Sequence, residues 1–144
     1  MGGAVISTFI QLLASGLSLG AIYALVALGF VVIFRSSQVF NFAHGELVTL
    51  GAFLIATLAQ AGVPFLAALA LGALGTGLVA AGVERVVLRP MVGRPVFVTI
   101  ILTLFVGFVL RALLLIAFGT LPMGMATPWD PTAQVEIGGA AIFL

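Results

Sequence analysis

Three polar residues lie close together in an otherwise apolar part of the chain. Asn41, His44 and Glu46 belong to the stretch VFNFAHGELVTL, which runs directly into an apolar segment. Asn41 can cap the helix that follows, and Glu46 favours the positive end of that helix's dipole. Alternatively, a helix broken at membrane depth exposes these side chains to a translocation path, or they contact a neighbouring subunit.

Patterns typical of catalysis and metal binding are missing from the sequence. It has a single His, four acidic residues and no Cys, and it contains neither a GxxxxGK[ST] nucleotide loop nor an HExxH pair. We therefore predict no catalytic residue, no metal site and no cofactor bound by this chain. The five basic residues leave a net charge of +1, which is too small a field to hold nucleic acid.

Arginines mark two further candidate sites. Arg111 lies within a predicted spanning segment, about 10 Å by helix rise from the end of that segment. Its side chain either extends to the interface or faces the helix bundle, where it would attract an anionic substrate group or pair with an acid outside this chain. Arg85, Arg89 and Arg94 lie in a polar link that is typical of a cytoplasmic loop, and they are candidates for contact with a soluble cytoplasmic subunit.

The remaining composition is that of a membrane protein. Hydrophobic residues make up 63% of the chain and charged residues 6%, against roughly 45–50% and about 25% in soluble domains. We predict an all-α, polytopic transmembrane helix bundle. About four spanning helices are expected, at residues 10–34, 40–61, 65–83 and 96–118, and the second is long enough for a bilayer only if it begins near Phe40.

Turn-forming residues separate these segments. Gly62 to Pro64 form a tight turn, and two prolines interrupt the link from Glu84 to Pro95. Residues 119–136 contain three more prolines and predict an outer loop, in which Trp129 is expected at the level of the lipid headgroups. Residues 137–144 read as the start of a further apolar segment, so the end at Leu144 indicates a truncation.

The distribution of arginine predicts the orientation. If all four segments cross the bilayer, Arg35 falls on the same side as the polar link with its three arginines. The N-terminus, the turn at Gly62 and the outer loop fall on the other side. By the positive-inside rule the arginine side is cytoplasmic and the N-terminus is outside.

Small residues at four-residue spacing predict close helix packing, because helices in lipid associate through near contact of their backbones. Two such stripes on the third helix indicate that neighbours enclose it within a larger bundle. The alternative is that Gly and Ala are simply frequent in this composition. The candidate packing glycines are Gly16 and Gly20 in the first helix and Gly72 and Gly77 in the third.

A resemblance to a known family enters at the NFAHGE stretch, residues 41–46. Together with ERVVLRPMVGRP, residues 84–95, it resembles the N-terminal half of the LivH-type permeases of branched-chain amino-acid ABC importers. The resemblance extends from about Leu12 to Phe118. It implies that residues 1–144 are the N-terminal part of a single permease domain in a bacterial inner membrane, with Asn41, His44 and Glu46 among the family's signature residues.

The same resemblance implies partners and a division of labour. A second, homologous permease, two cytoplasmic ATPase subunits and an extracytoplasmic binding protein would complete the importer, and ATP would be hydrolysed on the ATPases. The substrates would be leucine, isoleucine and valine. The alternatives are a urea or amide permease, another small-solute permease of this type, and a structural membrane subunit without a conduit. Because family members are longer, we expect this chain to be one part of a permease.

Overall fold

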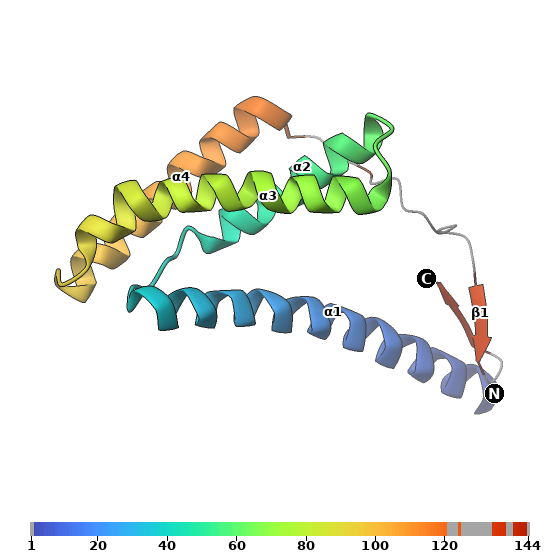
Figure 1. Ribbon diagram of the computed structural model, residues 1–144. Coiled ribbons are helices and arrows are strands. Elements are labelled where there is room, and N and C mark those ends of the chain that lie inside the picture. Colours follow the sequence, from blue (N-terminus) through green and yellow to red (C-terminus); the bar gives the residue numbers. More distant parts are fainter. Residues whose placement is uncertain (1, 121–123, 125–133, 138–139, 144) are drawn as a thin grey trace. The chain divides into compact units, whose positions relative to one another are not determined.

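Helices dominate the computed structural model, which describes residues 2–120, 124, 134–137 and 140–143 (Figure 1). The chain forms two compact units, one of Met1–Ala27 with Thr127–Leu144 and one of Leu28–Ala126. The predicted class, an all-α bundle of membrane-spanning helices, is confirmed, with one short β-hairpin in addition. The helices are α1 (Gly2–Ser37), α2 (His44–Gln60), α3 (Phe65–Val83), η1 (Glu84–Leu88), η2 (Arg89–Met91) and α4 (Val96–Phe118).

The hairpin lies in the first unit, which also holds most of α1. Strand β1 (Gln134–Ile137) pairs antiparallel with β2 (Ala140–Phe143), so that Gln134 lies opposite Phe143. The sequence predicts a loop through residue 136 and does not predict this hairpin. Trp129 lies outside the described residues.

Three of the described helices are long and apolar enough to cross a membrane, namely Thr8–Ser37, Phe65–Met91 and Val96–Phe118. The predicted second span, 40–61, differs from α2, which begins only at His44 and has 17 residues, about 26 Å. The reason is that the side chain of Asn41 accepts a hydrogen bond from the backbone N–H of Ala43, and such local bonds compete with helix formation.

The third span is longer than predicted. The sequence predicts a non-helical link from Glu84, yet the chain continues from α3 through the π-helical turn η1 and the 3₁₀ turn η2 as far as Met91. Pro90 is tolerated because it occupies the first turn of η2, where a missing N–H costs little. The break falls instead at Gly93, whose φ of 83° suits a residue without a Cβ.

In the second unit, α2 packs against both α3 and α4 (Figure 1). The contact with α3 depends on small residues. A Cβ at Gly72 would lie 2.5 Å from Cγ1 and 3.3 Å from the backbone nitrogen of Ile55, whereas a Cβ at Gly77 would meet nothing within 4 Å in the described structure. One of the two small stripes on α3 therefore lies on α2, and the other is open.

The segment between α1 and α2 lies on α4. The hydroxyl of Thr103 donates to the carbonyl oxygen of Phe40 at 3.2 Å and to that of Ile100, in its own helix, at 3.0 Å. One turn further along, a Cβ at Gly107 would lie 3.5 Å from Cα of Ala43. Gly107 is the middle residue of α4, about 16 Å along the helix from Val96. The break between α1 and α2 therefore reaches the middle of a membrane-spanning helix at Ala43.

We expect Gly72→Ala to destabilise the packing of α2 on α3. The added methyl group meets both a side chain and the backbone of Ile55, and overpacking of this kind costs about 1–3 kcal/mol. Unfolding of the chain in detergent, followed by far-UV circular dichroism, measures the effect. Gly77→Ala is the matched control, because the new methyl group has open space and Ala is the better helix former. Equal stabilities of the two variants would contradict the packing described here.

Thr103→Val tests the attachment of the break to α4. This isosteric change leaves the Phe40 carbonyl oxygen without its donor and should lower the free energy of unfolding by about 1–2 kcal/mol. It should also speed hydrogen exchange at the amides of Ala43 and His44. Thr99→Val is the control, because Thr99 is equally buried but donates to Pro95 at the start of its own helix. Faster exchange in the control than in Thr103→Val would disprove the attachment.

Candidate functional site

The site is built around the non-helical segment from Gln38 to Ala43. Gln38 ends α1 in a left-handed conformation, with φ of 55°, and its N–H donates to the carbonyl oxygen of Phe34 at 2.8 Å. The hydroxyl of Ser37 donates to the carbonyl oxygen of Ile33. A non-glycine residue in this region costs about 1–2 kcal/mol, and strain of this kind concentrates at functional sites.

Asn41 holds the segment together from within. Only 3% of this residue is exposed. Its Oδ1 accepts from the Ala43 N–H at 3.1 Å, and its backbone carbonyl oxygen accepts from the His44 N–H at 3.3 Å. The residue that caps α2 is Ala43, which makes no side-chain cap bond. Asn41 therefore caps the turn before the helix and not, as one interpretation of the sequence has it, the helix itself.

His44, the first residue of α2, contacts the end of α1. A Cβ at Gly29 would lie 3.1 Å from Cε1 and 3.2 Å from Nε2 of the imidazole, so the ring rests against the α1 backbone. The ring of Phe30 meets the imidazole edge-on, with the centroids 6.3 Å apart. Glycine at position 29 is what permits this close approach, because any larger residue would displace the ring.

Glu46 points to α4 and approaches Arg111. The distance from Oε1 of Glu46 to Nη1 of Arg111 is 3.8 Å, and the two side chains are 23% and 67% exposed. The sequence analysis considered an acid outside this chain as the partner of Arg111, but the acid that approaches Arg111 is Glu46 of the same chain. The three predicted residues do not converge on one point, because Asn41 binds its own turn, His44 contacts α1 and Glu46 contacts α4.

A cavity of about 700 Å³ lies next to the end of α1 and the end of α3, on the side of the break away from Glu46 and Arg111. Its volume is within the usual range of small-molecule sites, about 300–1,000 Å³. Asn41 lines it, as does Arg89. The sequence analysis did not identify the other polar residues that line this cavity. One of them, Glu84, lies in a π-helical turn that has no clear sequence signal. Those residues are Ser36, Ser37, Gln38 and Glu84.

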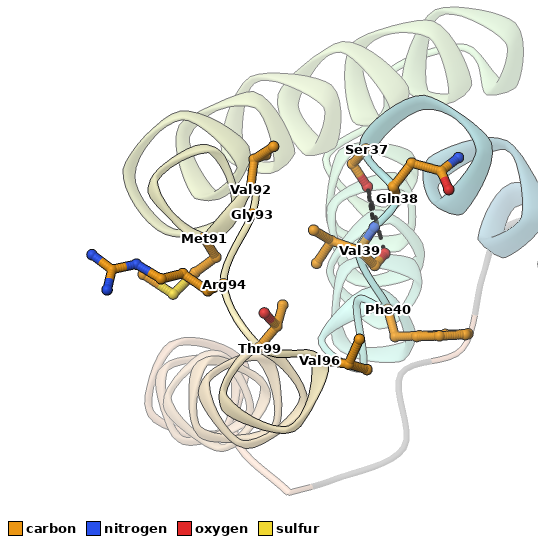
Figure 2. A pocket seen from close by; sticks show the side chains of 10 residues that line it. All are labelled: Ser37, Gln38, Val39, Phe40, Met91, Val92, Gly93, Arg94, Val96 and Thr99. Carbon is orange, nitrogen blue, oxygen red and sulfur yellow. Dashed lines mark hydrogen bonds between the residues drawn. The ribbon is translucent and has the colours of Figure 1, made fainter.

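A smaller cavity of about 70 Å³ lies where the end of α1 meets the segment that carries Arg94 (Figure 2). Ser37 to Phe40 line one wall, and Met91 to Arg94 with the start of α4 line the other. The end of α1, which carries Arg35, therefore lies beside the link that carries Arg94. The side chain of Arg94 extends away from the α1 end (Figure 2). Arg85 and Arg89 lie in the helical part of the same link, in η1 and η2.

The packing glycines of α1 lie in the first unit. A Cβ at Gly16 or at Gly20 would meet nothing within 4 Å among the described residues. Their role in helix association stays a prediction, as does that of Gly77. Gly72 alone of the four predicted packing glycines lies at a contact between described helices.

Known proteins resemble this chain in sequence. A family model described as "Branched-chain amino acid transport system / permease component" matches residues 12–140. Over 94 residues the chain is 36% identical to the high-affinity branched-chain amino acid transport system permease protein BraD of Pseudomonas aeruginosa. Over 92 residues it is 34% identical to the corresponding permease protein LivH of Salmonella typhimurium and 33% identical to LivH of Escherichia coli. No solved structure matches.

The matched segments cover 59% of this chain and 31% of BraD, and 58% of this chain and 30% of each LivH protein. The chain thus corresponds to only part of the length of these relatives. The family match, in contrast, covers nearly all of the chain. Together with three helices able to cross a bilayer, it identifies a multi-pass inner-membrane protein. The chain belongs to the permease family of branched-chain amino acid transport systems.

Proposed function

We propose that this chain is part of a transmembrane permease subunit of an ATP-driven ABC importer for branched-chain amino acids, and that it lines the translocation path. The observation that carries the proposal is the break from Gln38 to Ala43, which reaches the middle of α4 and lies beside the cavity of about 700 Å³. Irregular backbone at membrane depth is tolerated only where protein buries it or where it lines a water-filled cavity. Broken helices of this kind form the substrate sites of many transporters.

The break also explains how the short helix α2 can belong to a fourth membrane crossing. The helix alone provides about 26 Å, less than the roughly 30 Å of a hydrocarbon core. The six residues from Gln38 to Ala43 supply the remaining length, so α1, α2, α3 and α4 cross in turn. Arg35, Arg85, Arg89 and Arg94 then lie at one end, which is cytoplasmic by the positive-inside rule, and the N-terminus is outside.

The proposed function implies several partners. The permease carries out no bond chemistry, so the energy comes from ATP hydrolysis on two cytoplasmic ATPase subunits. Arg85 and Arg94 extend the chain's positive charge toward that side, where they are available for contact. A second, homologous permease completes the path, and an extracytoplasmic binding protein delivers the amino acid.

The orientation is testable by cysteine labelling, because the chain has no Cys of its own. We expect a membrane-impermeant maleimide to label Ala61→Cys in intact cells, and Val92→Cys only after the membrane is permeabilised. Both positions are exposed, so access to the reagent and not burial decides the result. The reverse pattern would place the arginines outside and disprove the orientation.

Transport is tested in cells that lack their own uptake system for these amino acids. The chain is produced within its full-length permease, together with the four partner components, and uptake of radiolabelled leucine, isoleucine and valine is measured. We expect uptake to depend on the permease, and Asn41→Ala to lower it about tenfold or more. Loss of a buried hydrogen-bond partner costs about 1–3 kcal/mol, enough to disorder the break.

Gln60→Ala is the control for this experiment. Gln60 also makes a side-chain hydrogen bond, to the carbonyl oxygen of Gly124, but it lies at the far end of α2. Its uptake should equal that of the unmodified protein at equal membrane abundance, measured by immunoblot. Uptake of urea without leucine would favour the amide permease, and leucine uptake that persists without this permease would favour a structural subunit.

A further inference from the structure

The ion pair of Glu46 and Arg111 is loose. Hydrogen-bonded ion pairs have N–O distances of about 2.7–2.9 Å, whereas these two groups are 3.8 Å apart. A guanidinium has five N–H donors in a planar fork, and two-thirds of the Arg111 side chain is exposed. The pair thus balances two charges within a membrane-spanning region and leaves room for other groups to approach either of them.

Two cavities adjoin Glu46, and one of them also adjoins Arg111. One, of about 230 Å³, is lined by Glu46, Arg111 and Thr49, so its wall is polar on one side. The other, of about 190 Å³, is lined by Glu46 and otherwise by apolar side chains, among them Leu50, Val79, Leu110 and Ala117. Glu46 and Leu114 belong to both cavities. Glu46 therefore lies between a cavity that Arg111 also lines and an apolar cavity.

We propose that Glu46 and Arg111 form a binding subsite for the zwitterion of a branched-chain amino acid. The Glu46 carboxylate receives the α-ammonium group, the Arg111 guanidinium takes the α-carboxylate in its fork, and the aliphatic side chain enters the apolar cavity. The inference rests on the proposed function and adds to it the residues that recognise the substrate.

Charge balance explains why an ion pair suits this task. Removing one partner from a pair in low dielectric is strongly unfavourable, because it leaves an uncompensated charge. A zwitterion that enters between Glu46 and Arg111 gives each group a new partner as the old one is lost. Urea carries neither charge and cannot make this exchange. The subsite thus selects amino acids over neutral amides.

Rigid elements hold the parts of the subsite. Glu46 and Leu50 lie one turn apart on α2, Arg111 and Ala117 lie on α4, and Val79 lies on α3. The stacked rings of Phe53 and Phe118, with centroids 4.9 Å apart, join α2 to α4 just beyond the pair. A site on packed helices keeps its geometry better than one on loops.

The test uses the complete importer in lipid nanodiscs without its binding protein, and it compares three ligands at equilibrium. Leucine carries both charges, leucinamide lacks the carboxylate and 4-methylpentanoate lacks the ammonium group. For Arg111→Gln we expect leucine to bind at least about tenfold more weakly, while leucinamide changes little. For Glu46→Gln we expect the converse, with leucine weakened and 4-methylpentanoate little changed. Arg35→Gln, which removes an arginine outside the subsite, should alter none of the three.

This reciprocal pattern separates recognition from a merely structural ion pair. A structural pair would weaken all three ligands by the same factor in both variants, or leave leucine binding unchanged, and either result overturns the subsite. If Arg111→Gln does not assemble, Arg111→Lys keeps the charge but lacks the fork. It should weaken leucine and 4-methylpentanoate and spare leucinamide; equal weakening of all three would again refute the subsite.

The proposed function and the subsite can fail separately. An unmodified importer that neither takes up nor binds leucine would refute the proposed function, and the subsite with it. If the unmodified importer takes up leucine normally, and neither Glu46→Gln nor Arg111→Gln changes its affinity for leucine, the subsite alone would be refuted. Ala117→Leu gives an independent measurement. Because the larger side chain fills the apolar cavity, it should weaken the binding of free leucine more than the binding of free alanine.

Discussion

The arrangement of the second unit depends on one constraint, that a backbone without helical hydrogen bonds must find other partners at membrane depth. Water supplies them in a soluble loop, but the hydrocarbon core offers none. Between α1 and α2 the protein supplies its own: the Asn41 side chain accepts from Ala43, and Thr103 donates to Phe40. Both polar side chains are almost completely buried. The break is therefore an ordered part of the fold.

Where α2 begins determines what its side chains meet. The turn at Asn41 delays the helix to His44 and places Ala43 opposite Gly107, the midpoint of α4. Since α2 and α4 then run in the same direction, the next turn brings Glu46 to Arg111, and a later one brings Phe53 to Phe118. A helix that began at Phe40 would lack this turn and would lose the close contact with Gly107. The ion pair is thus a consequence of the break.

The sequence predicts the helices better than the site. The bounds of α3 and α4 are those that the apolar runs predict, because Pro64, Pro95 and Gly119 mark their ends. Asn41 and Glu46 stand out as polar residues in an apolar chain. The contacts with α4 could not be predicted, since Thr103, which donates to Phe40, and Arg111, which approaches Glu46, are remote in sequence and meet these residues only after α4 has packed on α2. The π-helical turn at Glu84 likewise depends on tertiary packing.

The two polar regions of the second unit lie on opposite sides of the break. Glu46 and Arg111 lie beyond the midpoint of α4, whereas Glu84 and Arg89 lie with the cavity at the end of α1. Between them the chain presents Asn41, whose Oδ1 and backbone carbonyl oxygen already accept hydrogen bonds within its own turn. A solute that moved from one region to the other would leave one set of charges before it met the next. Under the proposed function, the two polar regions would therefore meet the solute one after the other, at different depths of the same path.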